Sequence, residues 1–458
     1  MNNNSIITMI LVISFFIIER FFLNNDALLT RFLEFQVVFI WFFSLYYSIK
    51  KFGLFSLYTL CLVGIFLFSV GAIFHFLISG DDIRHLERGF GYFCFSYHTI
   101  QLSLWIYSLF IFISFVTYSQ LYNRSKRKFA NIVSLQYNPL YFNIGKLLML
   151  FFFAIQLYKG YLYFAAFSAN RVEIFLYGNM ANPVPSWLRF LSTFFEVGYY
   201  FILASIPNEK ELKKYTLLYF VVIIPEIMLG NRSMFGAFIL FYLWYNYVYY
   251  GKSVVKVNNA IILGLIMLVI FQVMEIMRDG GDFSLSSISL TKFLVSQGVS
   301  FYILPLYIDN IGQIQYYLYP FILYPILGGF SNYTGQSIEA LNYKCGVGHQ
   351  LMYTVNPNYY LSGASFGSSS IVEIYDTGVV GLFFFSIFFA YMLVFFEKKF
   401  RTNRFYCFAC LFLVSHFVLS ARGSYFPQIY GLVKLFIFYK FMLWGGKLFW
   451  GYGHKRIF

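Results

Sequence analysis

The sequence contains few charged residues and few cysteines for a chain of 458 residues. Charged residues make up 11% of it and hydrophobic residues 60%, whereas soluble domains are about 25% charged and about 45–50% apolar. A soluble core cannot bury that much apolar surface, but a lipid bilayer can accept it. The composition therefore excludes an ordinary soluble domain and predicts a polytopic integral membrane protein.

Signatures of soluble enzymes are also missing. The sequence has no P-loop, no GxGxxG, no GxSxG and no HExxH motif. Cys407 and Cys410 form a CxxC in an apolar run, but no further cysteine or histidine ligands lie nearby, and zinc sites need four ligands. We expect no metal and no cofactor. Any chemistry is expected at the outer face, on a preactivated substrate rather than with ATP inside.

Long apolar runs predict an all-α protein with about twelve membrane-spanning helices. They lie near 5–22, 35–49, 54–78, 99–119, 147–167, 190–206, 215–229, 235–250, 260–277, 371–396, 405–421 and 427–445. Two semi-apolar stretches, 293–308 and 316–330, are interrupted by proline. They are interfacial helices, re-entrant helices or two extra spans, which would make about fourteen. The chain thus divides into nine spans with short loops (1–277), a long loop (278–370), and three spans with the C-terminus (371–458).

Basic residues orient these spans. Lysine and arginine cluster in every second connection, at Lys50 and Lys51, at 124–128, at 210–214 and at 398–404. By the positive-inside rule these connections are cytoplasmic, as are both termini, and the loop 331–370 lies outside. The net charge of +14 therefore anchors the protein to anionic lipid and does not indicate a nucleic-acid site.

Arginines occur at the predicted outer ends of spans. Arg232, Arg278 and Arg422 each have a nearby glycine in a short turn, and Arg171 and Arg189 bracket the loop between the fifth and sixth spans. One interpretation is that these side chains mark the interface by snorkelling. The other is that they converge on an anion, because guanidinium groups bind phosphate oxygens bidentately.

Acids and one histidine are the other candidates. Glu373 and Asp376 are three residues apart, and so share one helix face. Acids of the spans, Glu196 among them, either pair with a basic residue such as Lys159 or Lys434 to hold helices together, or serve as a base or a ligand of sugar hydroxyls. His349, in the outer loop, is a candidate general base or a surface histidine without a role.

Three segments resemble a known family. Residues 230–233, Gly-Asn-Arg-Ser before an apolar span, are similar to the G-x-R segment of Wzy-type O-antigen polymerases. Residues 363–381 resemble the late segment of that family, in which a small-residue run enters a span through an acid and a G-x-x-G turn. The turn at Arg422 and Gly423 fits as well, as does the map of many spans with one long late periplasmic loop.

The resemblance implies a metal-independent glycosyltransferase of the bacterial inner membrane with a GT-C-like architecture. It would join undecaprenyl-pyrophosphate-linked oligosaccharide repeat units at the periplasmic face, with the growing chain as donor. Pyrophosphate departure needs fixed positive charge, for which the five arginines are candidates, and the acceptor hydroxyl needs a base, for which His349 and Glu373 are candidates. Membrane lipid, a chain-length regulator and a flippase are the candidate partners.

Two other functions fit parts of the sequence. An O-antigen ligase would share the donor and the outer arginines, but should carry a clearer loop histidine within an arginine-rich loop. A lipid-linked oligosaccharide flippase should show internal repeats and mid-membrane charges along a cavity. The sequence shows no repeat, and its long late loop argues against a flippase, so we favour the polymerase.

Overall fold

The computed structural model describes residues 25–88, 91–129, 135–169, 184–228, 232–251, 290–314, 319–328, 336–342, 346–363 and 365–450, with a few single positions between 262 and 272. Six of the described helices are long and apolar enough to cross a membrane. They are Asp26–Phe52 (α2), Leu57–Ser79 (α3, η1 and α4), Tyr97–Arg124 in α5, Pro139–Ala165 in α6, Gly378–Thr402 (α19) and Ile429–Leu448 in α22. The multi-helix membrane fold is therefore confirmed, and these six match predicted spans.

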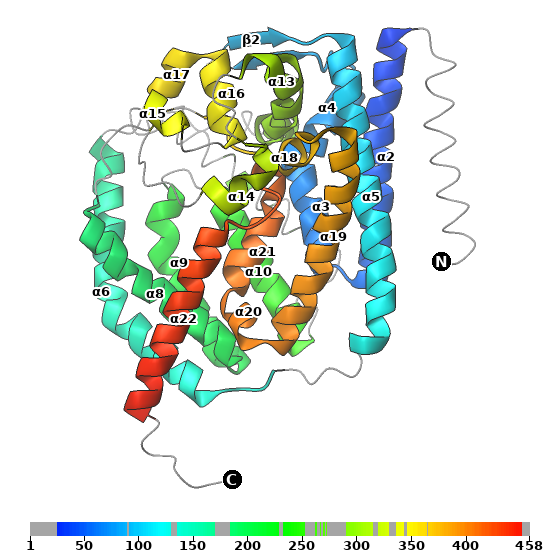
Figure 1. Cartoon of the computed structure of the whole chain (residues 1–458). Coiled ribbons are helices and arrows are strands. Elements are labelled where there is room, and N and C mark those ends of the chain that lie inside the picture. Colours follow the sequence, from blue (N-terminus) through cyan, green and yellow to red (C-terminus); the bar gives the residue numbers. More distant parts are fainter. Residues whose placement is uncertain are drawn as a thin grey trace.

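Two groups of helices make up the bundle (Figure 1). In the first, α2 and α19 pack against α5 (Tyr97–Phe129), and α3 (Leu57–Ile65) packs against α21 (Cys410–Val418). In the second, α6 (Pro139–Ala169) packs against α8 (Ser186–Ser205), α9 (Glu209–Met228) and α22 (Ile429–Trp450). Helix α10 (Arg232–Tyr250) contacts α21 and α9 and so joins the groups.

Helix α3 lies at the centre of the first group. Its side chains are almost fully buried, with Leu57 and Leu62 both 0% exposed. Gly64 permits a very close approach to α21, because a Cβ added there would lie 1.8 Å from the carbonyl oxygen of Val418. Together, α3, η1 and α4 form one continuous helical rod, which passes through a π-helical turn at η1 (Phe66–Val70) before α4 (Gly71–Ser79). π turns inside α-helices are rare and often occur at functional sites.

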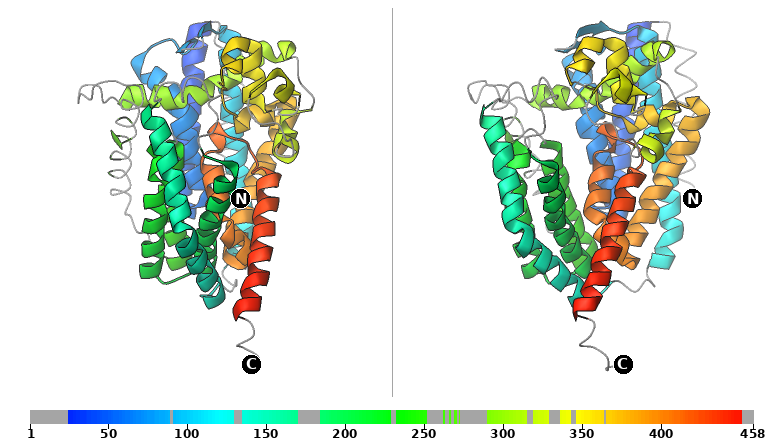
Figure 2. Two further views of the ribbon diagram at one scale, coloured as in Figure 1. Left: turned by 90° about the vertical axis from the view of Figure 1, so that its left-hand side faces the viewer. Right: turned by 60° about the vertical axis from the view of Figure 1, so that its left-hand side comes forward.

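A layer of short elements covers one end of the bundle (Figures 1 and 2), which we call the hairpin end. It contains an antiparallel hairpin of β1 (His85–Arg88) and β2 (Gly91–Cys94). The remaining elements are the short helices α12 (Leu290–Gln297), η3 (Gly298–Tyr302), α13 (Ile303–Asn310), η4 (Ile311–Gln313), η5 (Phe321–Leu323), α14 (Tyr324–Leu327), α15 (Ile338–Leu341), α16 (Val347–Val355) and α17 (Pro357–Leu361).

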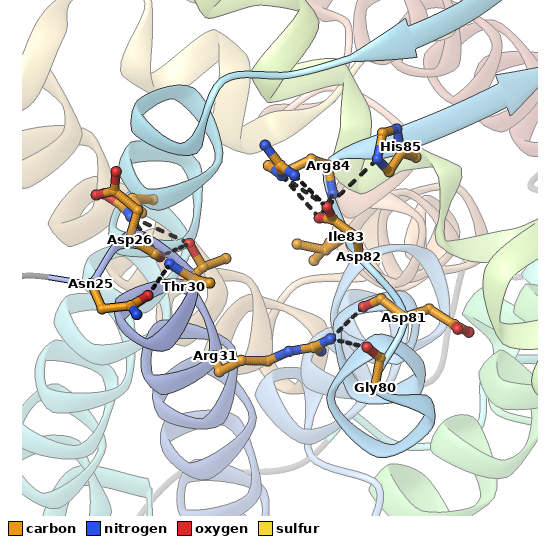
Figure 3. Close-up of polar contacts among 12 residues, drawn as sticks. Asn25, Asp26, Thr30, Arg31, Gly80, Asp81, Asp82, Ile83, Arg84 and His85 are labelled. Atoms are coloured by element: carbon orange, nitrogen blue, oxygen red, sulfur yellow. Dashed lines mark hydrogen bonds and ion pairs between the residues drawn. The ribbon is translucent and has the colours of Figure 1, made fainter.

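Polar side chains fix the helix ends beneath the hairpin (Figure 3). The side chain of Asn25 caps α2 by accepting from the backbone N–H groups of Ala27 and Leu28. The Arg31 guanidinium donates to the carbonyl oxygens of Phe76 (2.7 Å), Gly80 and Asp81 (2.6 Å). The Phe76 carbonyl also accepts from the Gly80 backbone N–H (3.1 Å), which caps α4. Arg31 thus fastens the end of α4 to α2.

The late loop contains no span-length helix among its described residues. The stretch 293–308 is divided among α12, η3 and α13, and 316–330 contributes η5 and α14, with Pro320 and Pro325 at their starts. Proline lacks the N–H group that a continuing helix needs. The structure therefore favours short helices across the bundle end over two extra spans.

Two predicted spans need correction. The span expected at 371–396 begins at Gly378, because Gly378 adopts φ +77°, and α18 (Ser370–Tyr375) forms a separate helix before it. The span expected at 405–421 is divided into α20 (Arg404–Phe408), α21 and η7 (Ser420–Arg422). Helices α8, α9 and α10 occupy three further predicted spans without being among the six apolar ones. The spans expected at 5–22 and 260–277 lie outside the described residues, apart from single helical positions in the second.

Candidate functional site

The segment that contains Glu373 connects distant parts of the chain. Glu373 is on α18, outside the six candidate spans, and is 0% exposed. Ser368 Oγ donates to its Oε1 (2.5 Å), and Ser424 Oγ (2.6 Å) and the Tyr425 backbone N–H (3.0 Å) donate to its Oε2. The carboxylate thus joins the loop before α18 to the turn that follows Arg422.

Burial and hydrogen bonding act on Glu373 in opposite directions. Burial raises its pKa to about 7, and the three donors partly offset this by favouring the charged form. A carboxylate whose two oxygens are both occupied and shielded from solvent is a poor base for an entering hydroxyl, because a base must reach the proton it removes. Its contacts suit a group that holds backbone segments in place.

Asp376, one helical turn further on, makes a second junction. It accepts a hydrogen bond at Oδ1 from the Tyr307 hydroxyl of α13, and one at Oδ2 from the Phe321 backbone N–H (2.6 Å). The two acids share a helix face as expected, but they bind different segments of the chain. Glu373 holds the turn before α22, and Asp376 holds the short helices of the late loop.

Gly367 lies between the α16 backbone beside His349 and the backbone of Arg422. A Cβ added at Gly348 would lie 1.7 Å from the Gly367 carbonyl oxygen, and Phe366 N–H donates to the Gly348 carbonyl (3.3 Å). A Cβ at Gly367 itself, which has φ +79°, would lie 3.7 Å from the carbonyl oxygen of Arg422. The backbone next to His349 and the backbone of Arg422 therefore contact the same glycine.

His349 is partly exposed on the first turn of α16. Its Nδ1 lies 3.4 Å from Gln336 Nε2, and its ring meets the Tyr360 ring edge-on at 6.1 Å. The hydrogen-bonding role of each ring nitrogen depends on the tautomer. The ring is thus oriented by neighbours and remains accessible, in contrast to Glu373.

Arg422 is exposed and ends η7. Its guanidinium carbon lies 5.9 Å from the centre of the Phe68 ring, on the π turn η1. That separation is at the outer limit of a cation–π contact. The Arg422 backbone N–H donates to the Leu419 carbonyl (2.9 Å), which fixes the turn.

The other arginines are not part of this cluster in the described structure. Arg189 is exposed on the first turn of α8, in the second helix group, and donates to Ser186 Oγ (3.1 Å). Arg232 begins α10, but its side chain lies outside the description, as do Arg171 and Arg278 altogether. The structure therefore brings together His349, Glu373, Asp376 and Arg422, which we call the Gly367 cluster.

Several residues that contact this cluster were missed by the sequence interpretation. Tyr307, Tyr425 and Phe68 had no distinguishing signal, because each reads as an ordinary aromatic residue of an apolar stretch. Gly367 lies within the segment 363–381, and Ser424 follows the turn at Arg422 and Gly423, but neither residue was assigned a role. In contrast, the expected pairing of Glu196 is confirmed, with Lys159 Nζ 3.8 Å from its Oε1. Among the described residues, no group of three His, Cys, Asp or Glu residues is arranged to hold a metal ion.

Comparison with known proteins identifies a family. The family model described as O-antigen polysaccharide polymerase Wzy matches residues 5–451, nearly the whole chain. No curated protein matches the chain, and no solved structure does.

Proposed function

Because the chain belongs to the O-antigen polysaccharide polymerase Wzy family, we propose that it forms the new glycosidic bond at the Gly367 cluster. Membership makes it a multi-pass membrane glycosyltransferase that polymerises lipid-linked repeat units. It also decides against the ligase and the flippase. The position and the chemistry of the transfer are the parts that we add.

The hairpin end is proposed to face the periplasm. Lys50 and Lys51 lie in the last turn of α2, and Lys399 and Arg401 in the last turn of α19, at the opposite end of the bundle. The positive-inside rule then puts that end, and both termini, in the cytoplasm of a bacterium. In this assignment, the described short helices of the late loop 278–370 cover the periplasmic end, and the loop connects the membrane segments 1–277 and 371–458 of a GT-C-like enzyme.

Arg422 is proposed to bind the pyrophosphate of the undecaprenyl-linked donor. The observation that carries the proposal is its arrangement: an exposed guanidinium on a backbone turn that Glu373 fixes through Ser424 and Tyr425. Charge fixed before the reaction stabilises a leaving pyrophosphate without reorganisation. Arg189, Arg171, Arg232 and Arg278 are further candidates for the same anion or for the second lipid-linked substrate.

His349 is proposed as the general base. The acceptor hydroxyl oxygen bonds to the anomeric carbon of the growing chain while the bond from that carbon to the pyrophosphate oxygen breaks. The hydroxyl proton passes to the imidazole, and undecaprenyl pyrophosphate leaves. Glu373 and Asp376 are assigned to positioning. No step requires a metal ion, because arginine supplies the charge that a metal would otherwise provide.

A gel of cell-surface polysaccharide tests this assignment. A strain that lacks the polymerase and expresses Arg422→Ala should contain normal amounts of the protein in its membrane. It should carry single repeat units on the lipid core and show no polysaccharide ladder. Lys398→Ala, an exposed basic residue at the cytoplasmic end of α19, should restore the ladder. A full ladder from Arg422→Ala would reject the role of Arg422.

Metal independence has its own test. Polymerisation by purified protein should continue at an unchanged rate in excess EDTA. A loss of activity that Mg²⁺ or Mn²⁺ restores would contradict metal independence.

The two proposed partners should have different effects. The chain-length regulator should alter only the length distribution of the ladder, and the flippase should alter only the supply of substrate.

A further inference from the structure

A cavity of about 410 Å³ lies at the hairpin end, away from the Gly367 cluster. Its walls come from α4 and β1 and from α12 and η3, two pairs of neighbouring elements that are far apart in sequence. Polar groups on its lining include His75, His85, Glu87, Thr291 and Ser296. Its volume falls within the roughly 300–1,000 Å³ that is typical of small-molecule sites.

The base of the cavity is held by buried aromatic packing. Tyr302 is 1% exposed, and its hydroxyl donates to the carbonyl oxygens of Ile83 (3.1 Å) and His85 (3.5 Å). Its ring stacks on Phe95, with centroids 6.0 Å apart, and meets Phe76 edge-on at 6.5 Å. The strand that carries His85 is therefore fixed to the helices, so the cavity has a defined shape.

Close contacts of η3 and α12 with α4 hold the other wall. A Cβ added at Gly298, the first residue of η3, would lie 2.4 Å from the Cβ of Ala72, and one added at Gly71 would lie 2.9 Å from Cδ2 of Leu294 on α12. Packing this close leaves little freedom for η3 and α12 to move relative to α4. Thr291 and Ser296 line the cavity from α12, and His75 and His85 line it from α4 and β1.

The charges around the rim are largely neutralised by each other (Figure 3). The Arg84 guanidinium binds Asp82 through Nε (2.9 Å) and Nη2 (2.6 Å) and holds the pKa of that carboxyl below its usual value. His85 Nε2 lies 3.5 Å from Asp82 Oδ2, and the Tyr92 hydroxyl lies 2.6 Å from His85 Nδ1. The lining itself is mixed: Phe76, Leu86 and Val295 contribute apolar surface beside the polar groups, and no lysine or arginine is among its residues.

Such a lining matches a sugar better than a phosphate or an acyl chain. A pyranose presents hydroxyl groups around its ring, which both donate and accept, and C–H groups on its faces. Imidazole and hydroxyl groups can take either role, a carboxylate accepts, and aromatic rings suit the C–H faces. A phosphate would need cations in the lining, and an acyl chain would leave the imidazole, carboxylate and hydroxyl groups of this lining without partners.

The position of the cavity relates it to the proposed transfer site. Phe68, beside Arg422, and His75, in the cavity wall, lie on the same helical rod. Seven residues of helix separate them by roughly 10 Å along the axis, with His75 nearer the hairpin end. A glycan whose pyrophosphate is bound at Arg422 and whose sugars extend away from the membrane would pass this point.

We propose that the cavity between α4, β1, α12 and η3 is a saccharide subsite that binds a non-reacting sugar of the lipid-linked repeat unit. The inference rests on the proposed function, since it takes its ligand class from the polymerase reaction. Its role is to retain the glycan between successive additions, so that loss of the subsite shortens the product without preventing bond formation.

Binding of lipid-free repeat-unit oligosaccharide to the purified full-length protein tests the subsite. Saturation-transfer NMR in detergent should show binding to the wild type and to Arg422→Ala. The double variant His85→Ala/Glu87→Ala should bind at least about tenfold more weakly. The matched control, His98→Ala/Glu339→Ala, changes the same residue types at exposed positions outside the cavity and should bind normally.

Two outcomes overturn the proposal. Equal affinity of wild type and His85→Ala/Glu87→Ala for the oligosaccharide rejects the site, as does the absence of binding to wild type. In cells, the double variant should give a ladder shifted to short chains, whereas a missing ladder with retained oligosaccharide affinity would also reject it. Failure of the Arg422 proposal is a separate result, because it is seen in pyrophosphate binding and not in binding of the lipid-free sugar.

Discussion

Two substitutions of Glu373 distinguish between its roles as a positioning carboxylate and as a catalytic base. In Glu373→Gln, the amide oxygen can accept from Ser424 Oγ and the Tyr425 N–H, while the amide NH₂ donates to Ser368 Oγ, whose hydroxyl can reverse its role. The variant therefore keeps the three contacts but cannot take up a proton. We expect it to retain most of the polymerase activity and a normal ladder.

Glu373→Ala should have the opposite outcome. Ser424 Oγ and the Tyr425 N–H would each lose their acceptor in a buried site. An unsatisfied buried donor costs about 1–3 kcal/mol, so the two together cost about 2–6 kcal/mol. That is a large part of the stability of a typical domain, about 5–15 kcal/mol. We expect a lowered unfolding temperature, displacement of the Arg422 turn and loss of the ladder.

The assay is thermal unfolding of each purified variant in detergent, alongside the ladder in the deletion strain. Glu339→Gln changes an exposed glutamate of α15 in the same way and is the matched control. A Glu373→Gln protein that unfolds like wild type but makes no polymer would refute the reasoning, because it would identify Glu373 as the base. An unchanged unfolding temperature in Glu373→Ala would show that the junction is not needed.

Three further predictions follow from the same contacts. Burial raises the pKa of Glu373 from 4.5 in the unfolded chain to about 7. The unfolding free energy of the wild type should therefore fall as pH rises from about 4.5 through about 7, and that of Glu373→Gln should lack this decrease. Identical pH profiles of the two proteins would contradict the prediction. Gly348→Ala puts a methyl group 1.7 Å from a backbone oxygen and should abolish the ladder, whereas Gly312→Ala, with nothing within 4 Å, should not; equal ladders would show that the close approach is unimportant. Lys159→Met and Glu196→Gln should each lower the unfolding temperature, and the double variant should lose less than the sum, since the pair is 3.8 Å apart; simple additivity would show that the two charges do not interact.

The sequence predicted the membrane helices better than it predicted the site. Runs such as 54–78 and 427–445 are long and apolar, and the bilayer requires such runs wherever a helix crosses it; both became spans. The errors at 371–396 and 405–421 arose because hydropathy continues through short breaks. A positive φ at Gly378, the first residue of α19, separates α18 from α19, and composition does not reveal it.

The candidate residues were chosen by type, and their partners could not be read from the chain. Ser424 and Tyr425 meet Glu373 across 51 and 52 positions of sequence, and Tyr307 meets Asp376 across 69. Contacts of that kind depend on how helices pack, and no local pattern encodes them. The pairing of Lys159 with Glu196 was foreseeable because charges within spans must find partners.

Binding of undecaprenyl pyrophosphate to the purified protein in lipid nanodiscs tests the central claim most directly. Removing charged hydrogen bonds worth about 1.5–3 kcal/mol should weaken the affinity of Arg422→Ala by about 10–150-fold relative to wild type. His349→Ala and Glu373→Gln should bind as wild type does. An Arg422→Ala protein that binds the pyrophosphate with wild-type affinity would contradict the account.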